Sequence, residues 1–260
     1  MSNNLKLWDS FGKTDPKYTK AANVDGNKQT SLSGNYMVKL ATESLGPIGE
    51  CWGYRIIEER LDNTKPIMMK GADNKLSILK DGDSIVWEQN HTLLVEFWHG
   101  DRANTFTQFG HTKYRYMKTD GSKMIIDNEY AKKSLTDAMK KCLSLIGVCA
   151  DVFMGEFDNN GYQQAAQLEN DLKKADDKDA EYISKTEEFN NSIEDKRKAM
   201  SQCPNFQSMQ NVYGMAVQKI DREAPILGIN AEDAKFGIDA MYHQMSNKFT
   251  QDKDKENAAV

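Results

Sequence analysis

A lysine-bearing face on one candidate helix is the part of this sequence whose residue types and spacing suggest chemistry. In KKSLTDAMKKCLSLIGVCADVFMG, residues 132–155, a turn of about 100° per residue separates two faces. The apolar face carries Leu135, Met139, Cys142, Leu143, Ile146 and Cys149. The polar face carries Lys133, Asp137, Lys140 and Ser144. Such lysines either meet bulk water or bind a phosphate backbone.

Aromatic residues accompany the lysines along the chain. The set comprises Lys28, Tyr36, Trp52 and Tyr54 in the first part, and Lys133, Lys140 and Lys141 on the later helix. Proteins that bind single strands without sequence preference combine cations for the backbone with rings for the bases, and each stacked base contributes about 1–3 kcal/mol. Lysine and aromatic residues are common on any surface, so this composition permits such binding without requiring it.

Patterns typical of catalysis or of metal binding do not occur in the sequence. The GxxxxGK[ST], GxGxxG and GxSxG motifs are absent, which argues against nucleotide hydrolysis and hydrolase chemistry. Glu58 and Glu59 are adjacent on a candidate strand and point to opposite faces, so they cannot act as a carboxylate pair. His91 and His99 have no thiol or carboxylate spaced to complete a metal site, which favours packing or hydrogen bonding. We expect no enzyme activity, no cofactor and no metal.

Charge is distributed unevenly along the chain, whose net charge is −5. Residues 1–155 hold 21 Lys+Arg against 19 Asp+Glu, a net of +2, whereas residues 156–260 hold 13 against 20, a net of −7. A near-neutral domain can still bind nucleic acid if its lysines gather on one surface. The acidic second part therefore does not exclude a nucleic-acid partner for the first.

Composition indicates a domain with an appendage, because 260 residues with 39% hydrophobic content are too polar on average for one compact body. The sequence contains neither a run of ~18 apolar residues nor the apolar core of a signal peptide, so we expect a cytoplasmic protein without membrane contact. The cysteines show no CxxC spacing, and we expect buried thiols rather than disulfides or zinc ligands: Cys51, Cys142, Cys149 and Cys203.

The elements that position the lysines follow from hydrophobic period and turn residues. We expect a helix over residues 33–45, ended by Gly46, and a later helix that begins after Asp127 or Asn128 and ends or bends at Gly147. Strands are expected near residues 52–61, 92–97 and 104–117, with a turn-rich insertion at 71–84. The predicted fold is α+β, a three-stranded antiparallel sheet covered by a long helix, in the order β-β-β-α.

The part after residue 158 is predicted to be a helical, partly disordered acidic extension. Its apolar positions are sparse, which is typical of an exposed, marginal helix or a partly disordered arm. A last amphipathic helix over residues 231–249 either docks on the core or binds a partner, and residues 250–260 are expected to form a solvated tail.

Two segments, residues 26–54 and 130–151, resemble in the same order the signature regions of the Rad fifty-two superfamily of single-strand annealing proteins. The opening LWDSFGKTDPKYTK and the run KKSLTDAMKKCLSLIG look like bacteriophage members of it, small recombination proteins of the Sak type. The most specific pattern is carried by Ser134, Leu135, Thr136, Asp137, Lys140, Lys141 and Gly147.

The resemblance covers residues 5–158 and implies that residues 1–158 bind and anneal single-stranded DNA and assemble into a ring or filament. It assigns backbone contacts to Lys140 and Lys141, and Lys28 matches a lysine of the family. Ser144 and Tyr36 stand where the family has basic residues, so the DNA-binding groove would have fewer cations. DNA binding would then depend more on stacking or on Lys39. The DNA-binding candidates are therefore Lys140, Lys141, Lys133, Lys28, Tyr36, Lys39 and Ser144.

The expected function is ATP-independent binding of single-stranded DNA and annealing of complementary strands in homologous recombination and repair. Three alternatives stay open: a passive single-strand-binding or mediator protein, an RNA substrate, and a structural protein whose lysines meet only water. Residues 159–260 have no counterpart in the resemblance. A single-strand-binding protein or an exonuclease is a candidate partner for them, in a bacterial host cytoplasm if the chain is phage-encoded.

Overall fold

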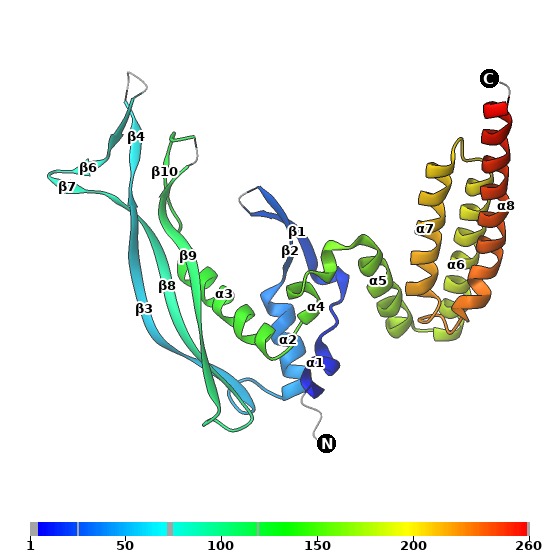
Figure 1. Cartoon of the computed structure of the whole chain (residues 1–260). Helices are drawn as coiled ribbons and strands as arrows, with labels where there is room; N and C mark the ends of the chain where they lie inside the picture. The colour runs from blue at the N-terminus through cyan, green and yellow to red at the C-terminus, as the bar shows by residue number, and fades with distance from the viewer. Residues whose placement is uncertain (1–4, 25, 72–74, 119, 259–260) are drawn as a thin grey trace. The chain divides into compact units, whose positions relative to one another are not determined.

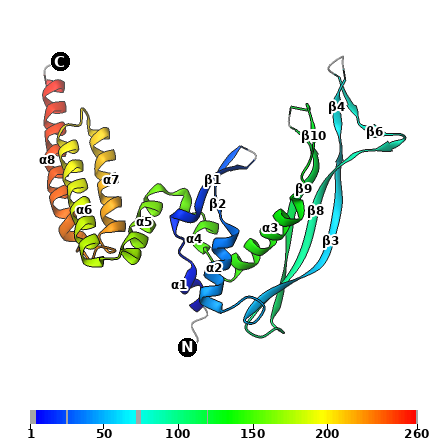
Figure 2. The ribbon, with the colours of Figure 1, turned by 180° about the vertical axis from the view of Figure 1, so that it is seen from behind.

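The computed structural model describes residues 5–24, 26–71, 75–118 and 120–258, and in it the chain divides into two compact units. The first, here called the sheet unit, comprises the chain up to Thr14 and Tyr18–Met154. The second, the helical unit, comprises Asp15–Lys17 and the chain from Gly155 onward. Figure 1 shows both units and Figure 2 shows them from behind. Each unit has its own hydrophobic core.

A four-stranded antiparallel sheet forms the frame of the sheet unit, in the order β10-β9-β8-β3. Its strands are β3 (Trp52–Pro66), β8 (Trp87–His99), β9 (Thr105–Met117) and β10 (Met124–Ile126). The prediction of a three-stranded sheet under one long helix was therefore wrong, although the class remains α+β. The fourth strand has only 3 residues, too few for an alternating pattern to be recognised before its pairing with β9 is known.

Helix α3 (Tyr130–Leu145) packs on β8 and β9 and covers one face of this sheet (Figure 1). Its buried residues are Ser134, Ala138, Met139, Cys142 and Leu143. Gly110 of β9 allows the close approach, because a Cβ at that position would lie 2.0 Å from the Ser134 carbonyl oxygen. The helix predicted from its apolar stripe is thus confirmed, and it rests directly on the backbone of β9.

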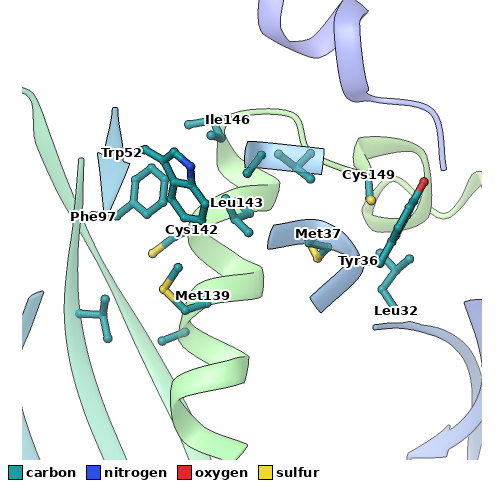
Figure 3. Packing of buried hydrophobic residues seen from close by; sticks show 14 of the residues in the cluster. Leu32, Tyr36, Met37, Trp52, Phe97, Met139, Cys142, Leu143, Ile146 and Cys149 are labelled. Carbon is teal, nitrogen blue, oxygen red and sulfur yellow. The ribbon is translucent and has the colours of Figure 1, made fainter. Parts of the chain in front are cut away.

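Helix α2 (Gly34–Leu45) crosses α3 and completes the core. It begins after Ser33 and ends at Gly46, where the backbone turns with φ of 100°, as the sequence predicted. Trp52 is fully buried, packs 5.8 Å from the ring centroid of Phe97, and donates from Nε1 to the Gly46 carbonyl at 2.9 Å. Figure 3 shows this packing beside Leu143 and Cys142.

The N-terminal segment holds helix α1 (Lys6–Phe11), the 3₁₀ turn η1 (Pro16–Tyr18) and a hairpin of β1 (Thr19–Val24) with β2 (Asn27–Leu32). The hairpin was not predicted, since its residues had been interpreted as a lysine-containing loop. Asp151 fixes the segment: its carboxylate accepts from the Thr14 amide at 2.7 Å and from the Thr14 hydroxyl at 2.5 Å.

The chain turns sharply after α3. Gly147 has φ of 100°, and a Cβ there would lie 2.7 Å from Cγ of Trp8, so only glycine fits. Cys149 adopts the left-handed conformation immediately before α4 (Ala150–Phe153). The predicted end or bend at Gly147 is confirmed. Cys142 and Cys149 are buried free thiols, and burial raises the pKa of each to about 12.

Two small hairpins occupy the region between β3 and β8. They consist of β4 (Met68–Lys70) with β5 (Leu76–Ile78) and of β6 (Lys80–Asp81) with β7 (Ser84–Ile85). The predicted turn-rich insertion at 71–84 falls here, and its residues 72–74 lie outside the described residues.

The helical unit contains the 3₁₀ turn η2 (Glu156–Asp158), α5 (Asn160–Lys174), α6 (Lys178–Ser201), α7 (Phe206–Glu223) and α8 (Ala231–Ala258). Its core brings together sparse apolar residues from all four α-helices, among them Leu168, Phe189, Met209, Ile220 and Ile238. The extension is helical as predicted, but the expectation that it is partly disordered was wrong for the described residues. Residues far apart in sequence supply the burial that no single segment provides.

The last helix docks within this bundle, with Ile238 and Met245 buried against α6 and α7. Its backbone stays helical to Ala258, where a solvated tail had been expected. Among the described residues, no helix combines the length and the apolar character that a membrane crossing requires.

Candidate nucleic-acid interface

The lysine stripe of α3 lies beside the beginning of α2. A Cβ on Gly34, the first residue of α2, would lie 2.8 Å from Cγ2 of Thr136 and 3.7 Å from Cε of Lys140. The absence of a side chain at Gly34 therefore brings the N-terminal end of α2 against the polar face of α3. The Ser33 side chain makes no capping hydrogen bond there, so it leaves the first N–H groups of α2 uncapped.

Lys140 has the environment best suited to an anion. Its side chain is half-buried, and burial lowers the pKa of its ammonium, while the Asp137 charge acts in the opposite direction. No carboxylate among the described residues forms an ion pair with it. A partly desolvated cation beside a helix N-terminus is stabilised by a phosphate more than a fully hydrated one.

Lys141, the second member of the pair, holds α3 to the sheet. Its Nζ lies 2.7 Å from Oδ2 of Asp137 and donates to the Phe109 carbonyl at 3.1 Å. The same Oδ2 accepts from the His111 amide at 3.0 Å. Lys141 and Asp137 together join α3 to β9, so the two lysines of the predicted pair have different environments.

Lys133 forms an ion pair with Asp127 just before the helix, at 2.6 Å between Nζ and Oδ2. The hydrogen bond between them raises the pKa of Lys133 and lowers that of Asp127, which also accepts from the Glu129 amide. The Lys133 side chain is 51% exposed, and an exposed ion pair contributes only about 0–1 kcal/mol, so a phosphate could replace the carboxylate.

The remaining predicted residues do not gather around Lys140 as a single group. Tyr36 is 8% exposed and stacks on Tyr18 with centroids 4.1 Å apart, so its ring faces protein and we leave it out of the proposed surface. Lys39 is exposed and lies 3.6 Å from Glu43, and Ser144 donates to the Lys141 carbonyl at 2.9 Å. Lys28 pairs with Asn23 across the β1–β2 hairpin, and its side chain lies outside the described residues.

A hydrogen-bonded Ser–His–Glu arrangement lies under α3. His91 Nδ1 is 3.0 Å from Oγ of Ser134, and its Nε2 is 3.0 Å from Oε1 of Glu59. Ser134 is 0% and His91 1% exposed, so a substrate cannot reach this hydroxyl. The prediction that His91 serves packing or hydrogen bonding is confirmed.

Sequence reasoning missed two features of this surface. Gly34 was not singled out within the helix expected over residues 33–45, although it sets the distance between α2 and Lys140. Asp137 was assigned to the wet face, whereas it bonds to β9. Both depend on a neighbouring element rather than on local spacing. No family model matches the chain, and no curated protein is significantly similar to it in sequence.

Proposed function

We propose that the protein binds single-stranded DNA along the polar face of α3 and anneals complementary strands without ATP. The observation that carries the proposal is Lys140, a partly buried ammonium with no ion-pair partner in the described chain, beside the uncapped start of α2. The resemblance of residues 26–54 and 130–151 to annealing proteins supports the strand-annealing part.

In this proposal, Lys140 binds one backbone phosphate. Lys133 leaves its ion pair with Asp127 and binds a second phosphate. Neutralising phosphates on two strands lowers their mutual repulsion, which accelerates pairing without any covalent step. Lys141 contributes electrostatically while it remains bonded to Asp137. The α3 surface thus accelerates association, and complementary base pairing supplies the specificity.

Self-assembly into a ring or filament is part of the proposal, and strand β3 supports it. This strand is an edge of the sheet and carries exposed apolar side chains at Ile56, Ile57 and Leu61, which are 44%, 48% and 44% exposed. A long apolar edge strand is a template for pairing with another chain. We also propose a cytoplasmic location and a recombination partner, a single-strand-binding protein or an exonuclease, for the helical unit.

A fluorescence-quench annealing assay with complementary oligonucleotides, at about 150 mM salt and without nucleotide, tests the proposal. We expect the wild type to accelerate annealing. Lys140→Gln should slow it and reduce the slope of log affinity against log salt by about one. Lys132→Gln is the matched control, because it removes an exposed lysine of the same helix that is paired with Glu129.

The outcomes separate the alternatives. Tight binding without acceleration would favour a passive single-strand-binding or mediator protein, and equal binding of an RNA oligonucleotide would widen the substrate class. Binding that Lys140→Gln leaves unchanged would contradict the α3 surface. If the wild type binds no single-stranded DNA, the alternative of a structural or interaction protein would be favoured.

A further inference from the structure

Among the described residues of the sheet unit, three cations lie over three aromatic rings. Arg102 is 4.7 Å from the ring centroid of Trp98, Arg60 is 5.7 Å from that of Phe109, and Lys113 is 5.8 Å from that of Tyr116. These are the two ingredients of a surface for single-stranded nucleic acid, and none of the six residues belongs to α3.

Trp98, Phe109, Arg60 and Lys113 share one face of the sheet, the face opposite α3. On β8, alternate residues Leu93, Val95 and Phe97 are buried in the core with α3, so Thr92, Leu94 and Trp98 point the other way. Phe109 is opposite Leu94, and both Arg60 and His111 are opposite Thr92, which places them on that same side. We call this surface the open sheet face, since Figure 1 shows α3 on the other side of the strands.

Charges on the open sheet face are partly compensated. Four ion pairs among the described residues lie on its strands. Two join β3 to β8, Arg55 with Glu96 at 2.7 Å and Lys65 with Glu88 at 3.6 Å, and two lie within β3, Arg60 with Glu58 at 2.6 Å and with Asp62 at 2.8 Å. Arg102, Lys113 and Lys118 form no ion pair with a carboxylate of the described residues. The face therefore keeps cations available at both ends of β9.

A cavity of about 330 Å³ lies at the end of this face near the small hairpins. Three lysines, one carboxylate and apolar side chains line it together, among them Lys65 with its partner Glu88, Lys113, Lys118 and Tyr116. A hollow of this size with a ring in its wall and lysines at its rim suits a base with its attached phosphate.

We propose that the open sheet face is a second surface for single-stranded nucleic acid, on which bases stack against Trp98, Phe109 and Tyr116 while Arg102, Lys113 and Lys118 bind phosphates. The rings receive separate bases rather than neighbouring ones, because the stretch from Phe109 to Tyr116 along β9 spans roughly 20 Å. The inference rests on the proposed function for its ligand class, and it assigns that ligand to residues that the α3 surface does not use.

The test compares three variants of the full chain in binding to oligothymidylate over a range of salt. Arg102→Gln, Lys113→Gln and Lys118→Gln together remove the cations of the face that have no described ion-pair partner, and Lys140→Gln removes the α3 site. The matched control removes three exposed lysines of the helical unit, Lys178, Lys198 and Lys248, as the triple glutamine variant. Phe109→Leu removes one ring while keeping an apolar side chain, and circular dichroism checks the fold of every variant.

We expect the open-face triple variant to lower the salt slope by about three and Lys140→Gln by about one, with no change in the control. Phe109→Leu should weaken binding about tenfold. Unchanged binding by the triple variant and by Phe109→Leu, with weakened binding by Lys140→Gln, overturns the second surface and leaves the proposed function standing. A change of subunit number in the triple variant also overturns it, because the face is then an interface between copies. A wild type that binds no oligothymidylate overturns both proposals.

Discussion

The two units differ in how fully the charges of particular lysines are compensated by carboxylates. In the helical unit Lys185 lies within 3.9 Å of three carboxylates, and Lys219 and Lys235 are paired with Glu223 and Asp221 at 2.6 and 2.7 Å. In the sheet unit Lys140 and Lys113 have no such partner among the described residues. The number of basic residues is therefore a poor guide to anion binding, whereas the availability of each cation is informative.

The cavities of the two units show the same contrast. A cavity of about 370 Å³ in the helical unit is lined by more carboxylates than lysines, and its lysines are paired, Lys185 with Glu188 and Lys219 with Glu223. The cavity at the open sheet face has Lys113 and Lys118 in its lining without a described ion-pair partner. Similar volumes thus offer a phosphate very different electrostatic environments.

If the two cores are energetically independent, the largest effect should come from Trp52→Ala. It removes a fully buried ring and its hydrogen bond to Gly46, and should cost the sheet unit about 3–5 kcal/mol. All four tryptophans, at 8, 52, 87 and 98, lie in the sheet unit, so tryptophan fluorescence follows its unfolding while far-UV circular dichroism is dominated by the helical unit. A parallel loss in both signals would show that the units unfold together.

The reciprocal change is Met209→Ala in the core of the helical unit. Met209 is 0% exposed, and its truncation should cost about 2–4 kcal/mol through lost burial and the cavity left behind. The urea midpoint followed by circular dichroism should fall, whereas that followed by tryptophan fluorescence should stay. Single-strand binding should also remain, and its loss would place part of the DNA surface in the helical unit.

Asp137→Asn should affect stability and binding in opposite directions. Losing the carboxylate weakens the contacts to Lys141 and to the His111 amide, at a cost of about 1–2 kcal/mol to the sheet unit. The same change leaves Lys141 without its counter-charge, so the salt slope for DNA should increase by up to about one. Urea unfolding and fluorescence anisotropy measure the two effects, and weaker binding would indicate that the ion pair itself shapes the site.

The smallest predicted effect concerns pH and the buried thiols. Burial holds the pKa of Cys142 and Cys149 at about 12, against about 8.5 in an unfolded chain. Because the folded pKa is the higher one, the thiols stabilise the sheet unit fully below about pH 8.5, and this contribution is lost as pH rises toward 12. At about pH 9 the loss is about 1 kcal/mol for each thiol. The tryptophan midpoint should fall between pH 7 and 9, and Cys142→Ala should remove part of that fall.

Local patterns predicted the elements whose burial is one-sided and regular. The alternation in β8 and the apolar stripe of α3 were readable because each contacts a single core along most of its length. The β1–β2 hairpin and β10 were missed because their residues are polar or few, and their strands are defined by pairing rather than by pattern. The bundle of α5–α8 was missed for a related reason, since each helix alone buries too little to be stable.

The candidate site was predictable in residue type but not in environment. Spacing placed Lys133, Lys140 and Lys141 on one helix, yet only the fold separates Lys140 from Lys141, which β9 and Asp137 engage. Trp98 and Phe109 of the open sheet face were not recognised, because their cations come from the β8–β9 turn and from β3. Cross-strand neighbours depend on register, which a single sequence does not specify.

Asp15–Lys17 belongs to the helical unit although it lies near the start of the chain, so no single cut in the gene separates the two units. The polypeptide leaves the sheet unit at Thr14, returns at Tyr18 and leaves again at Met154. Asp15 is bonded to Lys174, so a gene fragment cut at Gly155 would encode the helices without a carboxylate that they bind. Exchange of the whole helical unit between related genes would therefore need three coordinated crossovers, so the two units should be inherited together.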